Sequence, residues 1–347
     1  MREKVARIEK LAAHIAAEVG LSAADSALVA KAAHLCKNDL VALMVGEFPE
    51  LQGTMGRAYA LAAGDDPRVA DAIRDHWKPL GGDAPVAADV VSKVVAIADR
   101  LDSLVGCYAV GLSPTGAADP FALRRACIGF LRTMIEGAPA SWTKLHFGEL
   151  CSFAYGLYEG KKLDLDEAAT RQKLEGFAAE RLRGILEGQT TRAVADAVLA
   201  GNAFADGEIE PVVMRPAFAL AKARALSKLV EEKAPWLDKA RTVAKRLSGI
   251  SKEAKPEPIA KSAFSKPTDQ AIVDLVVALD EKTAALESEA AVREALAAMG
   301  PLAEQVDAIF VSTLVNDPND GITPLRLSLL SYGASCMMRI ADFTRLA

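Results

Sequence analysis

ADRLDSLVGCYAVGLSPTGAADPFALRR, residues Ala98–Arg125, begins with helical periodicity, continues through a stretch with glycine and proline, and ends on two arginines. A second segment, Glu47–Tyr59 (EFPELQGTMGRAY), shows the same mixture. Amphipathic packing alone does not select glycines, prolines and arginines at such irregular spacings. Both segments are therefore the first candidates for function, and the sequence around them indicates the scaffold that holds them.

That scaffold is predicted to be helical. Ser22, with Asp25 three residues later, has the pattern of a capping box at the start of a helix. No alternating strand pattern of convincing length is present, apart from ambiguous pieces near residues 105–112. One apolar stripe at helical spacing predicts a first helix that stops at Gly20: Val5, Ile8, Ala12, Ile15 and Val19. The fold class predicted is all-α.

The pattern of the sequence changes near residue 160. We therefore predict two domains, a degenerate helical domain at 1–160 and a second helical domain at 161–347. In the second, Asp164 is expected to cap a long helix toward Glu187, and residues 251–267 contain too many prolines for one helix. Gly300-Pro301 is expected to separate two helices. Further helices are expected at 192–199, 215–232, from Thr268, at 302–314, and from Pro324 to about Arg345.

Composition limits the class of protein. Hydrophobic residues make up 51% of the 347, without the run of about 18 to 20 apolar residues that a membrane span needs. The charged, amphipathic start lacks the apolar core of a signal peptide. Five scattered cysteines without CxxC spacing are typical of reduced, buried thiols rather than disulfides or a zinc site. We expect a cytoplasmic protein without a membrane partner.

The charge is unevenly distributed. The formal net charge is −5, but residues 222–266 hold twelve Lys/Arg against five Asp/Glu, a net of 12 − 5 = +7 that leaves −5 − 7 = −12 for the remainder. One basic sector in an acidic chain favours a localised phosphate-binding face. A solvated helix face followed by a basic linker is an equally open interpretation.

His34, the Asn38-Asp39 pair, His76 and Asp99 occur in an order that resembles the helical HD-type phosphohydrolases. In those proteins an upstream histidine, an adjacent His-Asp pair and a distant aspartate bind a metal that lowers the pKa of water. Asparagine occupies the place of the paired histidine and is a poor ligand for such a metal. We therefore predict no metal, and keep a metal-dependent nucleotide phosphohydrolase as the alternative function. The corresponding positions are His34, Asn38, Asp39, His76 and Asp99, with Asp102 as a substitute for Asp99.

Simpler interpretations of these residues remain open. A single histidine among alanines and leucines, as at His34, is more often packed or hydrogen-bonded than a ligand. Asp99 and Asp102 lie three residues apart and flank Arg100, so they are also compatible with a salt-bridge cluster on a helix surface.

Residues 35–60 (LCKNDLVALMVGEFPELQGTMGRAYA) and 97–132 (IADRLDSLVGCYAVGLSPTGAADPFALRRACIGFLR) closely resemble the beta subunit of bacterial two-subunit glycyl-tRNA synthetase. The resemblance extends from about Lys4 to Glu136 and implies an HD-like domain that lacks the metal pair and handles tRNA. It makes three arginines candidates for contact with the acceptor arm, with ion pairing to Glu47 or Asp99 as the alternative: Arg57, Arg124 and Arg125.

Residues 305–346 (QVDAIFVSTLVNDPNDGITPLRLSLLSYGASCMMRIADFTRL) resemble the helical anticodon-binding domain of the same subunit, akin to the DALR domains of arginyl-tRNA synthetases. Arg326 matches the helix arginine of that pattern, but GITPL replaces its usual upstream partner, and Arg326 could instead pair with Asp317 or Asp320. Phe218 and Trp236 are candidates for base stacking or for the core. The candidate cations are Arg224, Lys228, Arg241, Lys245, Arg246 and Arg326.

The resemblance also implies a division of labour. In that family the site that uses ATP, magnesium and glycine lies on a separate alpha subunit, within an alpha2beta2 assembly, and beta recognises tRNA(Gly). We therefore expect no catalytic residue and no cofactor in this chain, which should be the C-terminal part of a longer beta subunit. A purely structural, partner-binding module is the remaining alternative.

Overall fold

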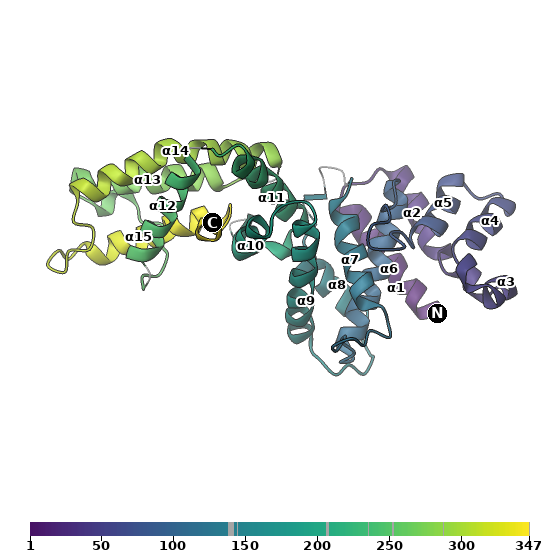
Figure 1. Cartoon of the computed structure of the whole chain (residues 1–347). Helices are drawn as coiled ribbons and strands as arrows, with labels where there is room; N and C mark the ends of the chain where they lie inside the picture. Colours follow the sequence, from purple (N-terminus) through teal and green to yellow (C-terminus); the bar gives the residue numbers. More distant parts are fainter. Residues whose placement is uncertain are drawn as a thin grey trace. The chain divides into compact units, whose positions relative to one another are not determined.

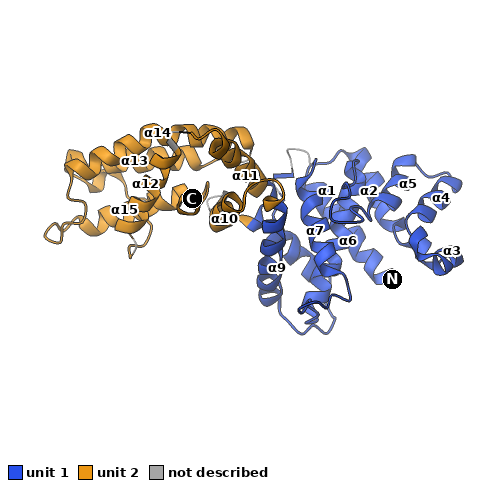
Figure 2. Cartoon of the chain, in the orientation of Figure 1, with its two compact units in different colours: residues 1–185, 213–217 blue, residues 186–212, 218–347 orange. Residues whose placement is uncertain are grey.

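The computed structural model describes residues 1–137, 142–143, 145–205, 208–234, 236–251, 253–286 and 288–346. Over these residues the chain is built from α-helices and one two-stranded antiparallel hairpin, which confirms the predicted all-α class (Figure 1). Two compact units are present, residues 1–185 with 213–217 and residues 186–212 with 218–347 (Figure 2). Each unit is described by itself.

The first unit is organised around helix α6, Val90–Ala109. Fifteen of its 20 residues are buried, and α1, α2, α5, α7 and α8 all pack on it. The other elements of this unit are α1 (Arg2–Glu18), α2 (Ala23–Leu35), η1 (Asn38–Val41), α3 (Leu43–Glu47), η2 (Pro49–Leu51), α4 (Thr54–Ala62), α5 (Pro67–Asp75), α7 (Leu123–Ile135), α8 (Phe147–Gly156) and α9 (Glu167–Glu187), where η marks a 3-10 helix.

The start of the chain forms as predicted. The stripe of α1 is buried at Ile8, Ala12 and Ile15, and Gly20 follows the helix with a φ of +67°. Such a φ is open to glycine at little cost, so the chain can turn there. The Ser22 hydroxyl accepts a hydrogen bond from the Asp25 amide at 3.1 Å, which confirms the predicted cap of α2.

The second unit contains a bundle of four helices. Helix α13 packs on α14 and α15, and α12 packs on the same two helices. The hairpin pairs Asn202 with Pro211 and Ala203 with Glu210. The elements that lie wholly or mostly in this unit are α10 (Arg192–Ala200), β1 (Asn202–Ala205), β2 (Glu208–Pro211), α11 (Pro216–Glu231), α12 (Trp236–Ile250), η5 (Lys261–Ala263), α13 (Pro267–Thr283), α14 (Glu289–Ser312), α15 (Thr323–Met338) and η6 (Phe343–Arg345). The short η4 (Val212–Met214) belongs mostly to the first unit.

Several element boundaries differ from the sequence prediction. Asp166, not Asp164, caps α9, because its carboxylate accepts from the Ala169 amide at 2.8 Å, whereas the Asp164 amide donates to the Ala109 carbonyl. The α-helix α15 ends at Met338 rather than near Arg345. The hairpin at residues 202–211 was not predicted, since four-residue strands carry too little alternation to detect.

The predicted break at Gly300-Pro301 is wrong. Helix α14 continues through Pro301, and the two helices are separated earlier, where α13 ends at Thr283 and α14 begins at Glu289. A proline inside a helix costs about 3 kcal/mol. Buried side chains on both sides of Pro301, including Met299 and Leu302, form one apolar stripe whose burial offsets that cost.

Candidate functional site

A buried cluster of charged side chains lies on α6 at Asp99. The Lys37 ammonium, just after α2, is 2.7 Å from the Asp99 carboxylate and 2.8 Å from Nε2 of His76, the residue that ends α5. The same ammonium lies 3.5 Å from the centre of the Trp77 ring, a cation–π contact. The Lys37 side chain is 2% exposed. Three helices are thus joined through one ammonium group.

The protonation of this cluster follows from its geometry. Nδ1 of His76 lies 2.8 Å from the Ile73 carbonyl, which can only accept, so Nδ1 carries the proton and Nε2 accepts from Lys37. Burial, reinforced by the positive charge of Lys37, lowers the pKa of His76 to about 3. Burial by itself raises the pKa of Asp99, but Lys37 and Lys4 together hold it well below its usual range. His76 is therefore neutral and Asp99 ionised.

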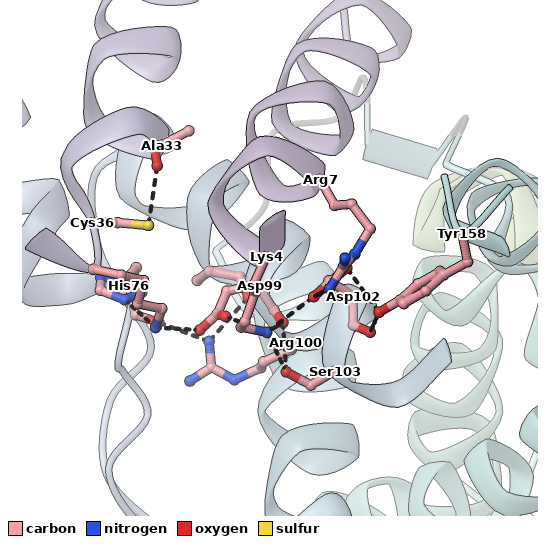
Figure 3. Close-up of polar contacts among 12 residues, drawn as sticks. Lys4, Arg7, Ala33, Cys36, His76, Asp99, Arg100, Asp102, Ser103 and Tyr158 are labelled. Carbon is pink, nitrogen blue, oxygen red and sulfur yellow. Dashed lines mark hydrogen bonds and ion pairs between the residues drawn. The ribbon is translucent and has the colours of Figure 1, made fainter. Parts of the chain in front are cut away.

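A second layer of charges fixes the neighbouring turn of α6 (Figure 3). Lys4 of α1 contacts the carboxylates of both Asp99 and Asp102, at 3.0 and 3.1 Å. Burial opposes the charge of Lys4, yet these two carboxylates raise its pKa. Asp102 also accepts from Arg7 at 2.5 Å and from the Tyr158 hydroxyl at 3.0 Å. Asp99 and Asp102 therefore anchor α1 and the segment after α8 to α6, instead of forming a surface cluster on one helix.

The remaining HD-type positions lie apart from this cluster. His34 is exposed and its Nδ1 contacts Glu9 at 2.7 Å. Asn38 is exposed, and the buried Asp39 accepts from the Gly53 and Gly56 amides at 2.6 and 3.2 Å. The structure thus brings together His76 and Asp99 only, with Lys37 between them. Among the described residues, no group of three or more His, Cys, Asp or Glu is placed to hold a metal ion.

Lys37 was not among the site residues predicted from the sequence. Its ammonium already satisfies the free nitrogen of His76 and one oxygen of Asp99, the two groups that a metal would otherwise bind. A signal was present, because Lys37 follows the buried Val29 and Ala33 at spacings of four, so it continues the buried face of α2 just beyond the end of that helix. A lysine there needs a buried carboxylate partner.

The glycines of the second quoted segment have packing roles. Gly53 precedes α4 with a φ of +76°, and a Cβ atom on it would lie 2.7 Å from the Trp77 ring. A Cβ on Gly56 would lie 2.6 Å from the side chain of Ile73 and 3.0 Å from Asp39. Arg57 points to Asp71, at 2.6 Å, rather than to Glu47 or Asp99, and stays half-exposed. The Arg57 guanidinium, already paired with Asp71, is therefore only partly available to a phosphate at this turn.

The loop after α6 presents a different surface. Asp119 accepts from the amides of Leu123 and Arg124 at 2.7 and 3.0 Å, which starts α7 and occupies its N-terminal donors. The Arg124 guanidinium donates to the Gly116 carbonyl at 2.6 Å and braces the loop. Arg125 is exposed and has no hydrogen-bond or ion-pair partner among the described residues, and Phe121, four residues earlier in the sequence, is 54% exposed.

The basic sector of the second unit is largely neutralised by carboxylates. Lys222 is buried, donates to the Asn202 carbonyl at 2.7 Å, and burial lowers its pKa to about 7. Arg224 contacts the Gln189 amide, and Lys245 is exposed without a partner among the described residues. The ion pairs are Lys228–Glu289, Lys239–Glu304, Arg241–Asp238, Arg246–Asp307, Lys255–Glu257, Lys261–Asp274 and Lys266–Asp320.

Arg326 belongs to the interior of the bundle. It is 2% exposed, and its guanidinium contacts Asp269 of α13 at 2.5 Å and Asp320 at 2.7 Å. Of the two open interpretations, pairing with the preceding acidic loop is the one observed, so Arg326 is not available to RNA. Phe218 is buried, and the side chain of Trp236 lies outside the described residues.

The fold and the site define a helical protein whose first unit is held together by internal ion pairs. Its exposed side chains include Phe121 and Arg125 at the start of α7. Residues 1–200 match the sequence profile of the glycyl-tRNA synthetase beta subunit. The chain belongs to this family.

Similar proteins extend the match to almost the whole chain. Glycine–tRNA ligase beta subunits from Desulforamulus reducens, Syntrophotalea carbinolica and Neisseria gonorrhoeae are 33%, 34% and 32% identical to it, each over 99% of this chain. The alignments cover 48%, 48% and 47% of those proteins, so the chain spans about half the length of the curated relatives it matches. In the described part of the chain, no helix is long and apolar enough to cross a membrane.

Proposed function

We propose that this chain is the tRNA-binding, non-catalytic part of a glycine–tRNA ligase beta subunit. Family membership gives the reaction class, the attachment of glycine to tRNA. The observation that carries the proposal is the exposed pair Phe121 and Arg125 at the start of α7. ATP and magnesium are used on a partner alpha subunit, in the cytoplasm.

An exposed phenyl ring and an exposed guanidinium four residues apart in the sequence are side chains that can bind unpaired nucleotides. Bases that are not in a duplex stack on aromatic rings, while arginine holds the adjacent phosphate. The backbone of the loop before α7 is fixed by the hydrogen bonds of Arg124 and Asp119, and the Arg125 side chain takes no part in them. The single-stranded end of the tRNA acceptor arm offers such bases. We assign Phe121 and Arg125 to that end, with Arg57 as a weaker contact.

The second unit is assigned to the anticodon arm. Lys245 and Arg224 are its most accessible cations among the candidates, because Lys228, Arg241 and Arg246 already pair with carboxylates. A hollow of about 590 Å³ between the ends of α12 and α15 gives space for a base and offers polar groups to read its edge. Its polar lining includes Glu253, Asn316, Thr323 and Ser328.

No observation on the described residues supports the alternative function, a metal-dependent phosphohydrolase. A hydrolytic metal needs open positions on imidazole and carboxylate ligands. In this site the Lys37 ammonium holds Nε2 of His76 and an oxygen of Asp99 at hydrogen-bond distance. The cluster therefore supports a structural role, which is to hold α6 and the loop that follows it.

Replacing Phe121 and Arg125 tests the proposal. We expect Phe121→Ala to weaken tRNA(Gly) binding about tenfold, because stacking of one base contributes about 1–3 kcal/mol. Arg125→Ala should also weaken binding and reduce by about one the slope of log affinity against log salt, since one phosphate contact is lost. Fluorescence anisotropy titrations at several salt concentrations measure both quantities.

Phe48→Ala is the matched control, because Phe48 is 50% exposed and lies between α3 and η2, away from α7 in the sequence. It should leave tRNA affinity unchanged. Equal affinities for the parent chain, Phe121→Ala and Arg125→Ala would place the RNA contact elsewhere.

A further inference from the structure

A second hollow, of about 200 Å³, lies in the first unit and is lined by residues of α2, η1, α4 and α5. We call it the Asp39 hollow. Its inner wall is made of buried residues and its rim of exposed ones, so it opens to solvent. The inner wall includes Asp39, Gly56, Ala60 and Ile73, and the rim includes Asn38, Tyr59 and Ala63. The hollow is separate from the cluster at Asp99 and from the loop before α7, because it shares no lining residue with them.

The Asp39 carboxylate in the inner wall is only half satisfied. It is 2% exposed, and its Oδ2 accepts from the amides of Gly53 and Gly56 at 2.6 and 3.2 Å. Its Oδ1 is buried without a hydrogen-bond partner, and among the described residues no cation pairs with this carboxylate. Asp99, in contrast, is neutralised by Lys4 and Lys37. Because an uncompensated charge in a protein interior is costly, Asp39 calls for a cationic donor.

The rest of the lining restricts the class of ligand. It contains no lysine, arginine or histidine, and its second carboxylate, Asp65, already pairs with Lys31 at 3.3 Å. An anion or a free amino acid is disfavoured, because its carboxylate would meet two carboxylates. A divalent metal is disfavoured as well, since calcium and magnesium take six or more oxygen ligands, and the described residues contain no group of three or more His, Cys, Asp or Glu that could hold an ion.

The shape of the Asp39 hollow favours a short hydrocarbon chain. Leu35, Ala60 and Ile73 give it apolar walls. An apolar cavity of about 150 Å³ holds a benzene molecule, so about 200 Å³ is suitable for a ligand of roughly five to eight non-hydrogen atoms. The ligand should therefore combine one positive charge with a small apolar body.

We propose that the Asp39 hollow is a binding site for a small primary alkylamine. The ammonium group pairs with the Asp39 carboxylate and supplies the donor that Oδ1 lacks, in a charge-assisted hydrogen bond. The alkyl chain lies against Leu35 and Ile73. Because the lining comes from four helical elements, a bound amine stabilises the packing of α4 against its neighbours. This site does not depend on tRNA binding.

The test titrates the full chain with n-butylamine at pH 7 and constant ionic strength, by calorimetry. Three matched probes separate the parts of the ligand: butan-1-ol keeps the chain without the charge, butyrate reverses the charge, and potassium chloride supplies a cation without the chain. We expect saturable binding of n-butylamine and binding at least tenfold weaker for each of the other three, because only the amine supplies both the charge and the chain.

Variants locate the site. Asp39→Asn should weaken n-butylamine binding about tenfold or more, because asparagine keeps an oxygen for the amides of Gly53 and Gly56 but places an NH₂ donor where the ammonium would bind. Glu50→Gln is the matched control, at an exposed carboxylate outside the hollow, and should leave binding unchanged. Ala63→Phe, at the exposed rim, should also weaken binding by narrowing the opening.

Four results would overturn the assignment of the Asp39 hollow to an alkylamine. These are no saturable binding of n-butylamine to the parent chain, equal affinity for butan-1-ol, equal binding of potassium ions alone, and parent-like binding in Asp39→Asn. Folding is monitored by circular dichroism. Should Asp39→Asn misfold, Ala63→Phe decides, and parent-like binding in that variant would likewise contradict the site. The proposed function fails separately, when the parent chain binds no tRNA(Gly).

Discussion

The protonation state of the buried cluster follows from one hydrogen bond, which Nδ1 of His76 makes. Because Nδ1 donates to the Ile73 carbonyl, Nε2 must accept, and the Lys37 ammonium fills that position. The imidazole therefore stays neutral, and the positive charge of the cluster belongs to Lys37, Lys4 and Arg7. A residue that resembles a metal ligand in the sequence acts as a hydrogen-bond acceptor for a lysine.

This arrangement gives folding stability a dependence on pH. His76 has a folded pKa of about 3, against an ordinary value of 6.5. Between these values the unfolded chain binds one more proton than the folded chain. The stabilisation is therefore fully present above about pH 6.5 and is lost as the pH falls, by up to about 1.4 kcal/mol per pH unit.

We expect His76→Gln to remove much of this dependence between about pH 6.5 and 5, because glutamine accepts from Lys37 but does not titrate. Urea denaturation at several pH values measures the slope of the unfolding free energy. His34→Gln, at an exposed histidine, is the control and should keep the parent slope. A parent-like slope in His76→Gln would contradict the assigned neutrality of His76.

At the scale of elements, Lys37 links α2, α5 and α6. Its side chain reaches Asp99 of α6 and His76 at the end of α5, and both acceptors are buried. Arg100 reinforces the same junction from α6 by donating to the carbonyls of His76, Trp77 and Lys78 at 2.9, 2.9 and 2.6 Å. The packing of these helices thus depends on internal cations as well as on apolar side chains.

Lys37→Met should destabilise the chain by about 3 kcal/mol, because it leaves a buried carboxylate with only one of its two cations and removes the donor to His76. Lys31→Met on α2 is the matched control. Lys31 is half-exposed and pairs with Asp65 at 3.3 Å, so its loss should change stability by less than about 0.5 kcal/mol. Urea denaturation followed by circular dichroism compares the two, and equal small effects would contradict a structural role for Lys37.

Elements with local signals were predictable, and those set by tertiary contacts were not. The cap at Ser22 and the turn at Gly20 depend on neighbouring residues, so the sequence was sufficient. Pro301 read as a break because the burial that keeps α14 continuous is not local. Arg339, which directly follows α15, is buried and donates to Asp280 of α13 at 2.6 Å, although the two residues are 59 positions apart in the sequence.

The residues of the candidate site divide in the same way, into those that local sequence indicates and those that only tertiary contacts reveal. His76 and Asp99 could be selected from the sequence, since their residue types and spacing resemble a known pattern. Lys37 could not be paired with them, because it is 39 and 62 residues away from them in the sequence. Arg326 had two open interpretations, and only the burial of its guanidinium against Asp269 distinguished them.

For the whole molecule, the structure changes the interpretation of the charge distribution more than that of any other property. The net of +7 over residues 222–266 left a phosphate-binding face and a solvated helix surface equally open, and carboxylates on α13, α14 and the loop before α15 neutralise much of that charge. Of the cations proposed to contact RNA, Arg125 and Lys245 are exposed and have no partner among the described residues. RNA binding by this chain is therefore expected to rely on stacking as much as on charge.

The most direct test is a titration of the chain with tRNA(Gly) and with a non-cognate tRNA at several salt concentrations. We expect tRNA(Gly) to bind more tightly, with an affinity that falls as salt rises and a slope that corresponds to only a few phosphate contacts. Absence of tRNA binding at low salt, or identical affinities for both tRNAs, would contradict the assignment of this chain to tRNA(Gly) recognition.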